Sequence, residues 1–192
     1  MTRFWWVRHG PTHQKCFVGW SDVAADLSDT AAIARLDRHL PKGAFVISSD
    51  LQRSAKTADA ICSNRLRLPN DPDLREMNFG DWELKTFTEV AKTHPELSRQ
   101  FWESPGHLSP PNGESWYQSS ARVQRAVDKL IETHPNRDII VVAHLGVILT
   151  QLQRAANMPP SAAMSFMIDN LSVTQIDHLG DSWRVKGVNH KP

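Results

Sequence analysis

The chain has 192 residues, with 22 basic and 21 acidic side chains and a formal net charge of +1. This length favours a single domain over residues 1–192, with room for a sizeable core. The near-neutral charge argues against a nucleic acid or a membrane surface as the main partner.

The first half of the chain predicts a buried strand at 3–8, a helix at 27–40 with Ser28 as its N-cap, a buried strand at 43–50, a helix at 51–62 and a short strand from 65. A helix at 94–104, a long loop at 104–115 and a helix at 114–132 follow. The chain then continues with a buried strand at 137–144 and a helix at 146–158, and it closes with two or three strands that include an "LGDS" turn. Buried strands that alternate with helices predict an α/β fold whose mostly parallel sheet is covered on both faces. The closing hairpin predicts an antiparallel addition.

Two cysteines, Cys16 and Cys62, fit a reducing cytoplasm and no disulfide framework. The first residues do not read as a signal peptide, and no apolar run approaches the ~20 residues that span a bilayer. We therefore expect a cytoplasmic protein with no membrane partner. A homodimer is the default expectation if the protein is an oligomer.

Cationic and imidazole side chains follow the three buried strands. Arg8 and His9 end the first, Arg53 comes in the first helical turn after the second, and His144 ends the third. In open α/β sheets, ligands bind beyond the carboxyl ends of the strands, so these residues are expected to converge. Guanidinium groups match phosphoryl oxygens two at a time, and a neutral imidazole is a good nucleophile at phosphorus. The pattern therefore predicts a site for a small phosphorylated molecule.

Five motifs carry a family resemblance: "RHGPT" from residue 8, "SSDLQRSAKTA" from 48, "LREMNFGDWE" from 74, "PPNGES" from 110 and "VVAHLG" from 141. In this order they resemble the histidine phosphatase superfamily, the phosphoglycerate mutase-like group. Two of the motifs look most like the small phosphatases, including the α-ribazole phosphatase-like ones. The resemblance implies a three-layer α/β/α sandwich and a phosphatase that acts on small phosphomonoesters.

The resemblance also implies roles for individual residues. His9 is the nucleophile that becomes phosphorylated, Arg8 and Arg53 bind phosphate oxygens, and His144 donates to the transferring group. The backbone N–H of Leu145 is a further phosphate donor.

Glu76 is implied as the acid that protonates the leaving oxygen. Glu83 and Glu114 lie in neighbouring motifs and remain alternatives for this role.

Some positions depart from the family pattern. Lys15 stands where the family usually has Asn, and Leu145 stands where Gly is common. These changes leave the phosphoryl-binding residues intact and affect the part of the site that recognises the rest of the substrate. His13, Lys15 and Trp20 are candidates for the substrate rim.

No metal or other cofactor is expected. His9 and His13 have the spacing of helical zinc ligands, but Gly10 and Pro11 between them argue against a helix. Two rival functions remain open. One is a cofactor-dependent phosphoglycerate mutase, which "FVGWSD" from residue 17 favours; the other is a catalytically weak binding or regulatory module.

Overall fold

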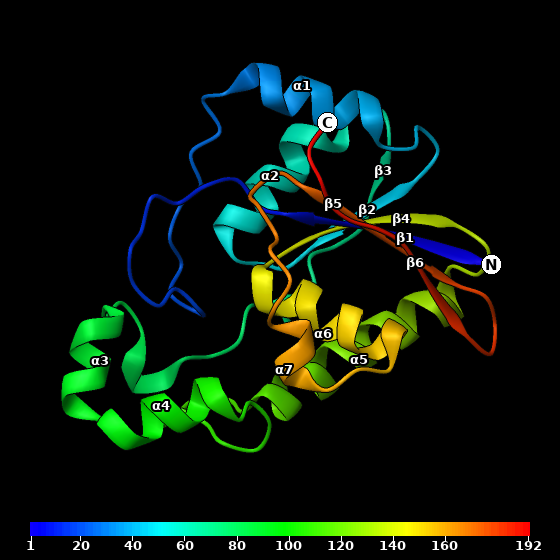
Figure 1. Ribbon diagram of the computed structural model, residues 1–192. Helices are drawn as coiled ribbons and strands as arrows, with labels where there is room; N and C mark the ends of the chain where they lie inside the picture. The colour runs from blue at the N-terminus through cyan, green and yellow to red at the C-terminus, as the bar shows by residue number, and fades with distance from the viewer.

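The computed structural model describes residues 1–192 (Figure 1). Its elements are β1 (Thr2–Arg8), α1 (Thr30–His39), β2 (Phe45–Ser48), α2 (Gln52–Cys62), β3 (Leu66–Arg67), the 3-10 turns η1 (Pro72–Leu74) and η2 (Gly80–Trp82), α3 (Phe87–Thr93), α4 (Pro95–Glu103), α5 (Trp116–Thr133), β4 (Asp138–Ala143), α6 (Leu145–Ala156), α7 (Pro160–Ala163), β5 (Val173–His178) and β6 (Trp183–His190). All the predicted helices and strands are present.

One six-stranded sheet has the order β3-β2-β4-β1-β5-β6. β3, β2, β4 and β1 run parallel to one another, while β5 is antiparallel to β1 and β6 is antiparallel to β5. The predicted mostly parallel sheet with an antiparallel C-terminal addition is therefore confirmed. The central strands β1 and β4 carry mostly buried residues on both faces, since helices cover both faces of the sheet. Apolar side chains on both faces are typical of strands in parallel sheets.

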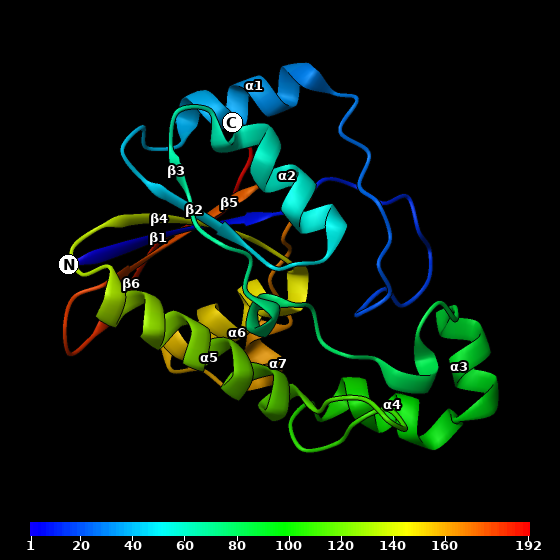
Figure 2. The same ribbon diagram turned by 180° about the vertical axis from the view of Figure 1, so that it is seen from behind.

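Helices cover the two faces in separate groups, giving the three-layer sandwich (Figures 1 and 2). On one face, Leu36 of α1 and Ile61 of α2 pack on Val46 and Val142 of the sheet. On the other face, α5, α6 and α7 build a larger core that includes Val127. Helices α1, α2, α5 and α6 are amphipathic in sequence, and their buried apolar residues lie on the side that meets the sheet.

Helices α3 and α4 form an arm beyond the carboxyl ends of the parallel strands (Figures 1 and 2). Helix α3 was not predicted from the sequence, although Thr86 and Glu89 form a capping box at its start. Helix α7, a single turn with Pro160 at its first position, was also not predicted. The arm matters for function because it stands over the edge of the sheet where the polar strand ends meet.

The start of α1 differs from the prediction. Asp29, not Ser28, is the N-cap, because its carboxylate accepts the N–H of Ala32 at 2.9 Å. Ser28 instead donates its N–H to Asp26. None of the helices combines the length and the apolar composition that a membrane-spanning helix needs.

Candidate active site

His9 lies immediately after β1, and its backbone is fixed on both sides. Its N–H donates to the carbonyl of Ala143 at 3.0 Å, and its carbonyl accepts the side-chain amide of Asn170 at 2.8 Å. The imidazole Nδ1 lies 2.7 Å from the carbonyl of Gly10. A carbonyl can only accept, so Nδ1 carries the proton and Nε2 carries the lone pair. Burial, followed by the charge of Arg53, lowers the pKa of His9 to about 3 and keeps the ring neutral.

His144 follows β4 and lies next to His9, with 5.1 Å between the ring centroids. Its Nε2 is 2.8 Å from the hydroxyl of Ser49, and its buried Nδ1 has no partner within the protein. Burial lowers the pKa of His144 well below its usual value, with the Arg53 charge as the next cause. If the Ser49 hydroxyl donates to Nε2, the proton of the neutral ring is on Nδ1.

Two arginines, the half-buried Arg8 and the buried Arg53, flank the histidines. Arg8 donates to the carbonyl of Ile168 at 2.6 Å, and its buried Nε has no partner within the protein. Arg53 donates to the carbonyls of Ser21 at 2.9 Å and Gly19 at 2.6 Å. Burial lowers the pKa of both guanidinium groups, yet arginine keeps its charge at physiological pH. The result is a buried positive centre at the ends of the strands.

His9, Arg8 and Arg53 line a cavity of about 200 Å³, whereas His144 is fully buried next to His9 and is not one of the lining residues. Its lining residues are Arg8, His9, Thr12, Gln14, Cys16, Phe17, Val18, Arg53, Glu76, Phe79, Phe87, Trp102 and Leu145. Leu145 is the first residue of α6, so its N–H belongs to the turn whose donors have no acceptor within the helix. A phosphoryl group in this cavity would meet guanidinium, imidazole and helix N-terminal donors together.

The three residues predicted for the substrate rim do not line this cavity. His13 pairs with Asp26 at 2.8 Å and lines a separate surface hollow, and Lys15 is exposed. Trp20 donates its indole N–H to the carbonyl of Glu76 at 2.8 Å. The structure therefore gives Trp20 a role in holding Glu76.

Glu76 lies at the cavity with its carboxylate buried. One oxygen accepts the N–H of Met77 at 2.9 Å, and the other accepts the N–H of Gly146 at 3.1 Å. Burial raises the pKa of Glu76, against the opposing effects of these two N–H groups and of Arg53 and Arg8. A carboxylic acid with a raised pKa is suited to donate a proton near neutral pH.

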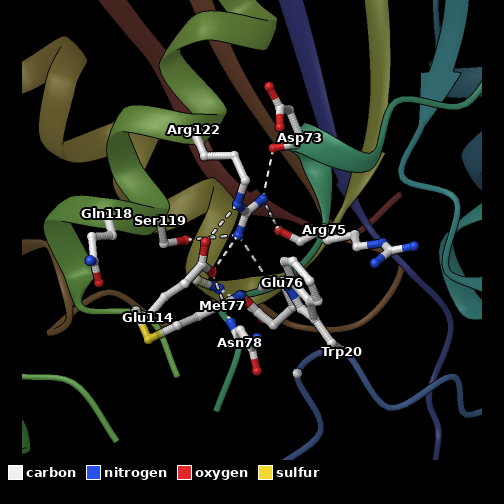
Figure 3. A network of polar contacts seen from close by, with 12 residues as sticks. Trp20, Asp73, Arg75, Glu76, Met77, Asn78, Glu114, Gln118, Ser119 and Arg122 are labelled. Atoms are coloured by element: carbon white, nitrogen blue, oxygen red, sulfur yellow. Dashed lines mark hydrogen bonds and ion pairs between the residues drawn. The ribbon is translucent and has the colours of Figure 1, made fainter. Parts of the chain in front are cut away.

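Arg122 of α5 holds the segment 73–76, which carries Glu76, because its guanidinium points toward the backbone of that segment (Figure 3). The guanidinium donates to the carbonyls of Asp73, Arg75 and Glu76 at 2.8–3.1 Å. It also forms a bidentate ion pair with Glu114. Since Arg122 is buried, this network fixes the backbone on which the carboxylate of Glu76 is carried.

The alternative carboxylates have other partners. Glu114 is occupied by Arg122 and by the N–H of Asn78. Glu83 accepts hydrogen bonds from the backbones of Gly19, Trp20, Ser21 and Phe79 and from the hydroxyl of Ser21. Neither lines the cavity, and Glu83 instead shapes the loop whose carbonyls hold Arg53. Of the three carboxylates considered from sequence, only Glu76 lines the cavity that His9 also lines.

Several cavity residues were not identified from sequence. Phe79, Phe87 and Trp102 reach the site from the middle of the chain and from the α3–α4 arm. No local motif marks Ser49 as a partner of His144, although it stands in the "SSD" that ends β2. No group of three or more His, Cys, Asp or Glu side chains is arranged to hold a metal ion.

Comparisons with known proteins agree with this geometry. The chain is 30% identical over 182 residues to the adenosylcobalamin/alpha-ribazole phosphatase of Escherichia coli, covering 91% of this chain and 89% of that protein. It is 31% identical over 190 residues to phosphoglycerate mutase-like protein 4 of Arabidopsis thaliana, covering 94% and 81%. Among solved structures, Bacillus stearothermophilus YhfR superposes with a TM-score of 0.91 at 26% identity, covering 99% and 98%. A mycobacterial glucosyl-3-phosphoglycerate phosphatase superposes at 0.86 with 26% identity, covering 98% of both chains.

The family model of the histidine phosphatase superfamily, branch 1, matches residues 4–191, which is nearly the whole chain. Arg8, His9, Arg53, Glu76 and Leu145, which lie in the motifs, are among the residues that line the cavity. The chain therefore belongs to branch 1 of the histidine phosphatase superfamily, as an enzyme of the histidine phosphatase type.

Proposed function

We propose that the protein hydrolyses small phosphomonoesters in two steps through a phosphohistidine on His9. The observation that carries this proposal is the Nδ1 contact with the Gly10 carbonyl, which leaves the Nε2 lone pair beside Arg8, Arg53 and His144. A neutral nucleophile among cations suits attack on a phosphate dianion, since the cations offset its charge.

In the first step, Nε2 of His9 bonds to phosphorus and the ester P–O bond breaks. The electron pair of that bond goes to the leaving oxygen, which takes the proton of Glu76. Arg8 and Arg53 hold the phosphoryl oxygens, and Nδ1–H of His144 and the N–H of Leu145 donate to them. The released alcohol then departs.

In the second step, a water molecule attacks phosphorus and the P–N bond breaks. The Glu76 carboxylate, now ionised, takes the proton from that water and returns to its acid form. Inorganic phosphate leaves, and His9 is neutral again. No metal or organic cofactor takes part in either step of this scheme.

Two of the relatives are named phosphatases of small phosphorylated molecules, which supports hydrolysis as the overall reaction. A relative named phosphoglycerate mutase-like supports a second candidate, transfer of the phosphoryl group within phosphoglycerate. The two differ in the fate of the phosphohistidine, because water accepts the phosphoryl group in one and a second hydroxyl in the other.

Product analysis separates these functions. We expect purified protein to release inorganic phosphate from p-nitrophenyl phosphate, and His9→Ala to abolish this release. His13→Ala is the matched control, because His13 lies outside the cavity and should leave turnover unchanged. Isomerisation of 3-phosphoglycerate without phosphate release would favour the mutase. Phosphate binding without turnover above background would favour a binding module.

A further inference from the structure

A second cavity, of about 300 Å³, adjoins the catalytic one. The two share Glu76, Phe79, Trp102 and Leu145 as lining residues, so the proposed acid stands at their junction. The second cavity continues between α4, α5, α6 and the segment after α7.

The lining of the second cavity is apolar apart from Glu76. Its remaining residues include Phe101, Trp116, Leu149, Met164 and Phe166. It contains no lysine, arginine or histidine and no hydroxyl or amide side chain. The indole N–H of Trp116 is already bonded, since it donates to Gln153. A hydroxyl-rich or anionic group placed here would find no cation and only the Glu76 carboxyl and the Trp102 indole N–H as polar side-chain groups, so most of its lost hydration would not be replaced, which is costly.

The position of Glu76 determines how a phosphate ester is oriented between the two cavities. The leaving oxygen must lie within hydrogen-bond reach of this carboxyl, and the phosphoryl group must lie with His9 and the arginines. The carbon attached to that oxygen then points past Glu76, where the second cavity begins. Its volume is about twice that of an apolar cavity that binds benzene, so a bicyclic aromatic group fits.

We propose that this second cavity binds the alcohol portion of the substrate, and that the preferred substrates are phosphate monoesters of uncharged apolar or aromatic alcohols. This inference rests on the proposed phosphatase function and adds a substrate class to it. It also argues against phosphoglycerate, because the carboxylate of that molecule finds no cation among the lining residues of the second cavity.

A series of n-alkyl phosphates from ethyl to hexyl tests the inference. Each buried methylene is expected to raise kcat/KM about fourfold, the ratio that corresponds to ~0.8 kcal/mol. Benzyl phosphate should exceed glycerol 3-phosphate and 3-phosphoglycerate by at least about a hundredfold. A flat alkyl series, or a preference for the anionic substrates, would overturn the inference.

Phe166→Ser is the variant that probes the cavity. Phe166 is 38% exposed, so its loss should leave the fold intact, and Met167→Ser is the matched control because Met167 is 72% exposed and does not line the cavity. Phe166→Ser should lower kcat/KM for benzyl and hexyl phosphate about tenfold and leave ethyl phosphate unchanged. An equal loss on all three, or the same loss in Met167→Ser, would contradict the assignment.

Failure of the proposed function would look different. If that function were wrong, no substrate would be hydrolysed through His9. If only the cavity assignment were wrong, His9-dependent hydrolysis of p-nitrophenyl and ethyl phosphate would persist without the chain-length dependence. Inhibition by inorganic phosphate, which occupies the catalytic cavity alone, should be the same in Phe166→Ser as in the wild type.

Discussion

Substitution of Gly146 by alanine should impair leaving-group protonation without weakening the fold. A Cβ at this position would lie 2.5 Å from an oxygen of the Glu76 carboxylate, about 0.9 Å inside ordinary contact at 3.4 Å. Every close atom belongs to the Glu76 side chain, so the carboxylate must move by about this distance. A displacement near 1 Å in a catalytic group costs on the order of 10²-fold in rate.

The assay compares kcat/KM for an alkyl phosphate and for p-nitrophenyl phosphate. An alkoxide needs a proton in order to leave, whereas p-nitrophenolate does not, so the ~10²-fold loss should appear only with the alkyl ester. Thermal unfolding should show an unchanged or higher Tm, because alanine is favoured over glycine in a helix by up to about 1 kcal/mol. Gly43→Ala is the control, since a Cβ there meets nothing within 4 Å.

Wild-type kinetics of Gly146→Ala with alkyl phosphate would refute the position of Glu76 as the acid. An equal loss on both substrates would show that the substitution disturbs phosphate binding instead. A Tm lowered by many degrees would show that α6, and not the carboxylate, absorbs the added methyl group.

The same geometry fixes the expected results of four further experiments. Glu76→Gln should slow alkyl phosphate hydrolysis by about 10²–10⁴-fold in kcat/KM. Burial raises the pKa of Glu76, and the acid form is the one that donates the proton. Wild-type kcat/KM for the alkyl phosphate should therefore be retained below that pKa and lost as the pH rises through it. The pH profile of Glu76→Gln with the same alkyl phosphate should lack this decline. Arg122→Lys should lower kcat/KM for the alkyl phosphate at least about tenfold and leave kcat/KM for p-nitrophenyl phosphate unchanged. The reason is that a lysine ammonium group cannot bond to three carbonyls and form a bidentate ion pair with a carboxylate. Equal losses on both substrates would show that Arg122 has a purely structural role. EDTA should leave turnover unchanged, because Arg8 and Arg53 supply the positive charge, and a loss restored by Zn²⁺ or Mg²⁺ would contradict the scheme.

The convergence of Arg8, His9, Arg53 and His144 could be predicted from sequence because it depends only on the topology of the sheet. Parallel strands bring their carboxyl ends to one edge, so residues that directly follow them converge whatever the loops do. His9 and His144 are separated by most of the chain, yet their rings lie 5.1 Å apart because β1 and β4 are neighbours. Arg53 follows the same logic through β2 and the first turn of α2.

The rest of the site depends on contacts that no local pattern encodes. Glu76 meets Gly146 across 70 residues, and Arg122 reaches the carbonyl of Glu76 from a different helix. The side-chain directions of His13 and Lys15 follow from loop backbone, including a positive φ of 57° at His13, and not from a regular periodicity. The apolar second cavity arises where three helices and a loop meet, so it appears only once they are packed together.

The central claim is that the phosphoryl group passes through Nε2 of His9, and direct isolation of this species tests it. Glu76→Gln should accumulate the intermediate, since it lacks the base that activates water in the second step. Protein quenched in alkali during turnover of labelled p-nitrophenyl phosphate should carry the label on the peptide containing His9, through a bond that is stable in alkali and labile in acid. Label recovered on serine, aspartate or cysteine, or on a histidine other than His9, would contradict the account.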